Sequence, residues 1–158
     1  MSLRHSGSLL RKTSTTSSIV LLVITLVIVV IGMLFVQGSK SGMYLRASNS
    51  VYTLAVADTP AAQEKGLGGR AWMPQHEGMI FVFDTPDTVC FWMKDMHFAI
   101  DMIWLNEAKK VVHLQSDVAP GSYPKRYCPP MPAKYVVELR AGEAARQSIR
   151  TGTTLMLE

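Results

Sequence analysis

The chain has 158 residues, of which 48% are hydrophobic and 18% charged, and its formal net charge is +4. This length allows one compact domain and a short additional segment. Four of the sixteen basic residues and none of the twelve acidic residues lie within residues 1–40, so the rest of the chain is charge-balanced. A charge-balanced domain lacks the positive surface of a DNA- or RNA-binding protein, and no nucleic-acid partner is expected.

The N-terminal part contains a long apolar run from Ile19 to Val36, in which Thr25 is the one polar side chain. A helix of this length covers roughly 27 Å, close to the thickness of a bilayer core. Basic residues are denser before the run than after it, which predicts a cytoplasmic N-terminus and an extracytoplasmic domain. The alternative is a cleaved signal peptide, whose apolar region is usually only about 7–15 residues long. We therefore expect a single-pass protein of the cell membrane, with a disordered cytoplasmic tail at 1–18, a transmembrane helix at 19–37, a linker at 38–42 and a domain at 43–158.

Apolar runs rich in β-branched and aromatic residues predict strands throughout that domain. A short helix is expected to begin at Asp58-Thr59-Pro60 and to end at Gly66, and another is expected at Glu143–Ile149. The proline-rich segment from Ala119 to Ala133 predicts a long loop. The pattern favours a mainly β fold, either a single compact β-sandwich or a partly closed β-barrel with two short helices. The predicted strands are 44–47, 51–57, 79–83, 89–94, 100–105, 111–118, 135–140 and 153–157.

The two cysteines, Cys90 and Cys128, allow two interpretations. They could form a disulfide in an oxidising exterior, or stay separate as a buried thiol in a strand and a second thiol in a loop. The sequence has no CxxC motif and no Cys/His spacing typical of a zinc site. No metal or other cofactor is expected.

Asp101 is the first candidate for chemistry, because it interrupts the apolar strand Ile100–Leu105. A carboxylate buried in a strand requires a partner, and Arg70, Lys94 and Lys134 are the candidates by sequence position. Asp101 could be a general base, a metal ligand or the anchor of a binding site. It could also form a structural ion pair that fixes the fold.

Other polar and aromatic groups are less specific. Asp95 and His97 could join Asp101 in a cation site, although a hairpin turn with solvated charges is the favoured interpretation of this segment. Trp92 and its aromatic neighbours could form a platform for a sugar or an apolar ligand, or could simply pack in the core. The sequence contains no G-x-S-x-G, P-loop or GxGxxG motif.

Five motifs in this chain resemble those of the DUF192 family in their order and spacing. The resemblance covers about Val51 to Leu157 and implies a compact, largely β domain of sandwich or barrel type. The motifs are EKGLGGR at 64–70, GMIFVFD at 78–84, FWMKDM at 91–96, IDMIWL at 100–105 and AKYVVELRAG at 133–142.

The resemblance also marks positions that match the family's characteristic charged and aromatic residues. The chain departs from the family at Asp95-Met96, where Asn-Thr is usual, at Ala99, where proline is frequent, and at Gly121, where many members have a cysteine. Since the family has no settled activity, the resemblance implies a fold and a set of positions but no reaction. These candidate site residues are Arg70, Trp92, Lys94, Asp101 and Glu138.

Three hypotheses follow for the function. The first is a ligand-binding or interaction module of the cell envelope, with a carbohydrate or a protein as partner. The second is a hydrolase that uses Asp101 with Lys94 or Arg70. The third is an accessory structural subunit of a membrane assembly. We expect the first, because the domain combines aromatic-rich strands with a balanced charge and lacks a catalytic motif.

Overall fold

The computed structural model describes residues 19–28 and 42–158. Residues 19–28 are helical and belong to the segment predicted to cross the membrane. No helix in the described ranges is long and apolar enough to span a bilayer. The rest of that segment, at 29–37, and the tail at 1–18 lie outside the described residues, so the transmembrane prediction is not confirmed.

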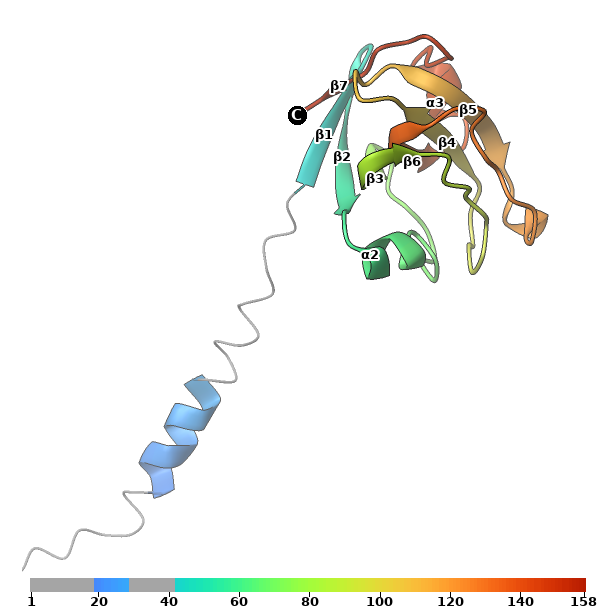
Figure 1. Ribbon diagram of the computed structural model, residues 1–158. Coiled ribbons are helices and arrows are strands. Elements are labelled where there is room, and N and C mark those ends of the chain that lie inside the picture. Colours follow the sequence, from blue (N-terminus) through green and yellow to red (C-terminus); the bar gives the residue numbers. More distant parts are fainter. Residues whose placement is uncertain (1–18, 29–41) are drawn as a thin grey trace, which may run out of the picture. The chain divides into compact units, whose positions relative to one another are not determined.

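Residues 42–158 are organised by one seven-stranded sheet with the order β5-β4-β6-β3-β2-β1-β7 (Figure 1). Neighbouring strands are antiparallel except β2 and β3, which are parallel. The strands are β1 Gly42–Ala47, β2 Ser50–Ala57, β3 Glu77–Asp87, β4 Ile100–Leu105, β5 Val111–Val118, β6 Ala133–Arg140 and β7 Met156–Leu157. The helices are α2 Pro60–Lys65, α3 Glu143–Arg146 and the 3-10 turn η1 Pro120–Ser122.

The sheet curls until its two ends meet. The outermost strands are β5 and β7, and the segment before β7 is hydrogen-bonded to the start of β5. Lys110 and Thr154 form an antiparallel bridge there, and the Val111 N–H donates to the Thr153 carbonyl at 2.8 Å. The mainly β prediction is confirmed. Of its two alternatives the partly closed barrel is correct, since one curled sheet replaces the two sheets of a sandwich.

Side chains alternate between the two faces of a strand, and the buried residues accordingly form two clusters. The inner cluster lines the concave face and includes Leu54, Ile80, Ile103, Val137 and Leu139, with Ala144 of α3 packed against them. The outer cluster lies on the opposite face and includes Phe81, Met93, Met102, Trp104 and Val136.

Helix α2 begins and ends as the sequence predicts. The Thr59 hydroxyl accepts the N–H of Ala62 at 3.3 Å, and Pro60 occupies the first turn. Gly66 ends the helix with a φ of 48°, and its N–H donates to the Ala62 carbonyl. A Cβ at Gly66 would lie 3.3 Å from the Phe81 ring, so glycine lets the end of the helix pack closely on β3.

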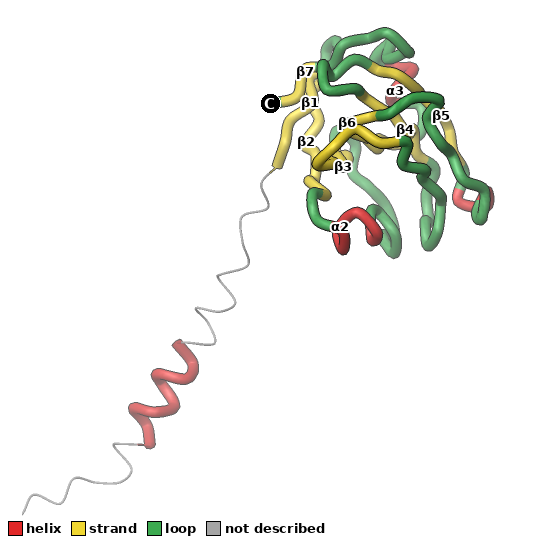
Figure 2. The backbone as a smooth tube through the Cα atoms, viewed as in Figure 1, coloured by secondary structure: helices red, strands yellow, loops and turns green. Residues whose placement is uncertain are grey.

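The predicted strand at 89–94 is wrong. Residues 88–99 form a loop between β3 and β4, in which Phe91 makes an isolated bridge to Tyr127 (Figure 2). Strand β4 pairs with β5 and β6, so both of its edges are occupied and no hairpin turn forms at 94–97. The predicted strand 153–157 shortens to β7, and the second helix ends at Arg146 instead of Ile149.

The pairing of β3 with β6 leaves no space for a side chain at Gly78. A Cβ there would lie 2.6 Å from the Glu138 carbonyl and 2.8 Å from Cδ2 of both Leu54 and Leu139. We expect Gly78→Ala to lower the free energy of unfolding by about 3 kcal/mol, because an overpacked core must shift. Urea denaturation measures this loss. Gly121→Ala is the control, since no atom lies within 4 Å of its added Cβ. Equal stability of the two variants would contradict the packing argument.

Candidate functional site

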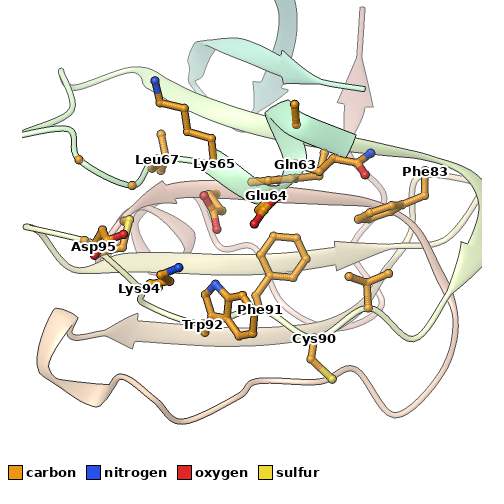
Figure 3. A pocket seen from close by; sticks show the side chains of 18 residues that line it. Gln63, Glu64, Lys65, Leu67, Phe83, Cys90, Phe91, Trp92, Lys94 and Asp95 are labelled. Carbon is orange, nitrogen blue, oxygen red and sulfur yellow. The ribbon is translucent and has the colours of Figure 1, made fainter. Parts of the chain in front are cut away.

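A pocket of about 760 Å³ lies where α2 and the loops after α2 and β3 gather (Figure 3). Its base is part of the outer cluster, through Phe81 and Leu67. The lining side chains come from α2 and its following loop, from β3, from the loop 89–96 and from β6. The pocket thus draws on segments far apart in the sequence, which the sheet brings together.

One wall of the pocket is aromatic. Phe81, Phe83, Phe91 and Trp92 line it. The rings of Phe81 and Phe91 meet edge to face with their centres 4.8 Å apart. In Figure 3, Phe91 and Trp92 both point toward the side of the pocket formed by Glu64. Trp92 is 43% exposed, and the Arg126 guanidinium lies over its ring at 5.7 Å from the centre, so part of the indole surface remains open.

The other lining side chains include five charged groups, three acidic and two basic. Glu64, Lys65, Lys94 and Asp95 are solvent-exposed, whereas Glu138 is buried. Figure 3 shows the Lys65 side chain extending away from Phe91 and Trp92. The pocket therefore combines an apolar wall with a polar lining that carries charges of both signs.

Two glycines hold the α2 loop close to the turn at 94–95. The Gly69 N–H donates to the Asp95 carbonyl at 2.8 Å. A Cβ on Gly68 would lie 3.0 Å from the Lys65 carbonyl and 3.5 Å from that of Lys94. Gly68 thus lacks a side chain where backbones approach closely, and Gly69 has a φ of 77°, a conformation that favours glycine. The contact fixes one side of the pocket.

A disulfide fixes the other side. Cys90, which lines the pocket, is bonded to Cys128 in the loop before β6, 38 residues later. Beside it, Phe91 and Tyr127 exchange two backbone hydrogen bonds of 2.8 Å each. Of the two interpretations left open by the sequence, the disulfide is the correct one. It ties the aromatic wall to the proline-rich loop.

Glu138 lies in the pocket without a partner. It belongs to β6, is only 4% exposed, and its side chain lines the pocket. Among the described residues, no hydrogen-bond donor contacts its buried oxygen Oε2. Burial raises the pKa of Glu138 to about 8, and the charge of Arg70 opposes that rise by a smaller amount. This carboxyl therefore holds its proton near neutral pH.

Asp101 lies on the opposite face of the sheet and is fully buried. Its Oδ1 accepts the N–H of Asp117 and its Oδ2 accepts the N–H of Ala144, each at 2.8 Å. The partners are backbone amides, and neither the predicted ion pair with Lys94, Arg70 or Lys134 nor a cation site with Asp95 and His97 occurs among the described residues. An inaccessible carboxylate with both oxygens bonded cannot serve as the base of a hydrolase.

Glu143 is a third buried carboxylate, and the sequence did not single it out. Its Oε2 accepts the hydroxyl proton of Tyr52 and its Oε1 accepts from Arg146, both at 2.6 Å. The Arg146 guanidinium lowers the pKa of Glu143. Burial, and to a smaller extent the hydrogen bond to Glu143, raise the pKa of Tyr52 to about 12. This network holds α3 to β2 and is not part of the pocket.

Three of the five candidate residues thus line the pocket, namely Trp92, Lys94 and Glu138. Arg70 is near enough for its charge to affect Glu138, and Asp101 lies elsewhere. Sequence reasoning did not propose Glu64 or Phe83. The alternation Phe81, Phe83 along β3 indicated a shared apolar face, but nothing in it separated a pocket wall from core.

The raised pKa of Glu138 predicts a stability loss with rising pH. Between about pH 4.5 and pH 8 the unfolded chain releases this proton while the folded chain keeps it, so the free energy of unfolding falls as pH rises. The loss amounts to about 1.4 kcal/mol per pH unit. Glu138→Gln removes it, so the variant gains stability over the wild type from pH 5 to pH 8. Urea denaturation at several pH values measures the difference, and parallel curves for the two proteins would contradict it.

Comparison with known proteins supports the fold and the family. A solved protein from Sinorhizobium meliloti 1021, described as a candidate transcription regulator, is 26% identical and superimposes with a TM-score of 0.67 over 74% of this chain and 92% of its own. A protein of unknown function from Novosphingobium aromaticivorans DSM 12444 is 27% identical, with a TM-score of 0.64 over 74% and 83%. No curated protein matches. The model of the DUF192 family, described as an uncharacterised ACR, matches residues 43–157, and the chain therefore belongs to that family.

Proposed function

We propose that this domain is a ligand-binding module of the cell envelope and that the pocket beside α2 is its site. The observation that carries the proposal is the unpartnered Glu138 carboxyl inside the pocket. A buried polar group without a partner costs free energy, and a ligand that bonds to it recovers that cost. A pocket residue with a strongly shifted pKa is a recognised indication of a functional site.

The dimensions and chemistry of the pocket support the same proposal. Ligand sites commonly have volumes of 300–1,000 Å³, apolar and aromatic walls and a few well-placed polar groups. This pocket has about 760 Å³, four aromatic side chains and the buried carboxyl of Glu138. An envelope carbohydrate fits such walls, because sugar rings stack on aromatic faces. Asp101 is fully buried with both oxygens bonded to backbone amides, which argues against a hydrolase that uses it as a base.

The location proposed for this module is the outer side of the cell membrane, with the chain anchored by its N-terminal apolar run. The uncharged segment Ile19 to Val36 and the basic residues before it support the anchor. The Cys90–Cys128 disulfide supports an oxidising compartment, because cytosolic thiols are kept reduced.

Ligand binding is tested with a pair of tryptophan variants. Trp92 lines the pocket, whereas Trp72 is 67% exposed and is not part of the lining. We expect envelope mono- and disaccharides, screened by thermal shift on the full-length protein in lipid nanodiscs, to stabilise the wild type and Trp72→Ala equally. Trp92→Ala should weaken binding about tenfold, since an aromatic contact contributes roughly 0.5–1.5 kcal/mol. If no compound shifts the wild type, or if Trp92→Ala binds as well as the wild type, the proposal is lost.

Membrane anchoring is tested by extraction at alkaline pH. We expect the full-length protein to stay in the membrane pellet and a chain without residues 1–42, directed to the same compartment, to be released. Intact mass spectrometry of the pellet fraction should give the uncleaved chain. Recovery of the full-length chain in the soluble fraction, or a mass that lacks the apolar run, would contradict an anchor.

A further inference from the structure

Resting on the proposed function, a narrower inference concerns the chemical class of the ligand. We propose that the pocket takes a molecule with a primary ammonium group on a ring-bearing body, and that the ammonium group pairs with the carboxylate of Glu138. The ring lies against the wall formed by Phe81, Phe83, Phe91 and Trp92.

The three buried carboxylates of the described chain differ in their partners. Asp101 accepts two backbone N–H groups, and Glu143 accepts from Tyr52 and Arg146. Glu138 alone among them has a buried oxygen with no donor in the described chain. An ionised carboxylate only accepts hydrogen bonds, and an ammonium group only donates them. The charged pair forms stronger hydrogen bonds than a neutral hydroxyl would form with the same oxygen.

The charge around Glu138 also favours an external cation. No cation of the described residues lies within ion-pair distance of Glu138, although Arg70 is near enough to lower its pKa slightly. The residues opposite it on β3 and β4 are Met79 and Met102, which carry no charge. Among the described residues, Glu138 thus has no ion-pair partner that would neutralise it when it is ionised.

The rings of the pocket wall favour a cation as well. Among the exposed lining groups, the carboxylates of Glu64 and Asp95 balance the charges of Lys65 and Lys94. Lys65 extends away from the aromatic wall (Figure 3), and Lys94 is exposed to solvent. The faces of aromatic rings also attract cations, by about 0.5–2 kcal/mol at close range. Acidic groups and aromatic faces together form the usual environment of an organic cation.

Binding of an ammonium ligand must release the proton of Glu138. The carboxyl is protonated at neutral pH, because burial raises its pKa to about 8. The affinity for a cation should therefore rise about tenfold from pH 6 to pH 7 and level off above pH 8. A neutral ligand, which leaves the proton in place, should show no such rise.

The experiment compares 2-phenylethylamine with 2-phenylethanol, which has the same ring and chain but no charge. Isothermal titration of the full-length protein in nanodiscs is carried out at pH 6, 7 and 8. We expect the amine to bind the wild type at least tenfold more tightly than the alcohol at pH 8, with the pH dependence given above. Glu138→Gln keeps the shape of the site and should bind the two compounds equally. A second pair, glucosamine and glucose, distinguishes an amino sugar from an apolar amine as the source of the ammonium group.

The possible results separate this inference from the proposed function. Equal binding of amine and alcohol by the wild type at all three pH values overturns the ammonium inference but leaves a ligand pocket. The same holds if Glu138→Gln retains the preference for the amine. If neither pair binds and the saccharide screen is also negative, both the inference and the proposed function fail. The pH series on the wild type tests the ammonium inference even if Glu138→Gln does not fold.

Discussion

Strand β6 is hydrogen-bonded on both sides, and this double pairing decides where the buried carboxyl groups of the domain lie. Glu138 stands opposite Met79 of β3 and Met102 of β4, while Leu139 stands opposite Asp101. Successive residues of a strand point to opposite faces, so one carboxyl enters the pocket face and the other enters the concave face. A register slip of one residue would exchange these faces along the whole strand. Because apolar side chains cover both faces, such a slip would leave Glu138 in the inner cluster and an apolar residue in the pocket.

On the concave face, the carboxylate of Asp101 accepts two backbone N–H groups. Between Ile100 and Met102 the register of β4 against β5 shifts, which is the mark of a bulge. The bulge frees the N–H of Asp117, a residue with a positive φ of 52°, and Asp101 accepts it. The second oxygen binds Ala144 at the start of α3. One side chain thus connects an irregular strand with the helix that packs on the inner cluster, which explains a charge in an apolar strand without any catalytic role.

The sequence predicts most of the sheet because strands and turns have local patterns, but the pocket depends on long-range pairing. The segment 89–94 is as apolar as a strand, and its apolar side chains serve the outer cluster and the pocket wall without joining the sheet. Asp101 attracts notice because it interrupts an apolar run. In β6, by contrast, Val136 and Glu138 share one face and Val137 and Leu139 the other, and by the same alternation the face of Glu138 also carries Lys134 and Arg140. Only the position of β6 between β3 and β4 shows that Glu138 reaches the pocket, so sequence alone could not identify it as the central group.

The walls of the pocket are held by interactions that do not involve a ligand. The Cys90–Cys128 disulfide fixes the aromatic side, and the hydrogen bond from Gly69 to Asp95 fixes the α2 side. A disulfide that closes a loop of this length stabilises a fold by roughly 3–4 kcal/mol. Without such fixed walls, the loops could close over Glu138 and supply it with a donor. The covalent link and the glycine contact oppose that collapse, and the domain keeps a buried carboxyl that an apolar residue would replace at lower cost. A preformed pocket loses little conformational entropy when it binds, and in the proposed binding function this advantage would offset that cost.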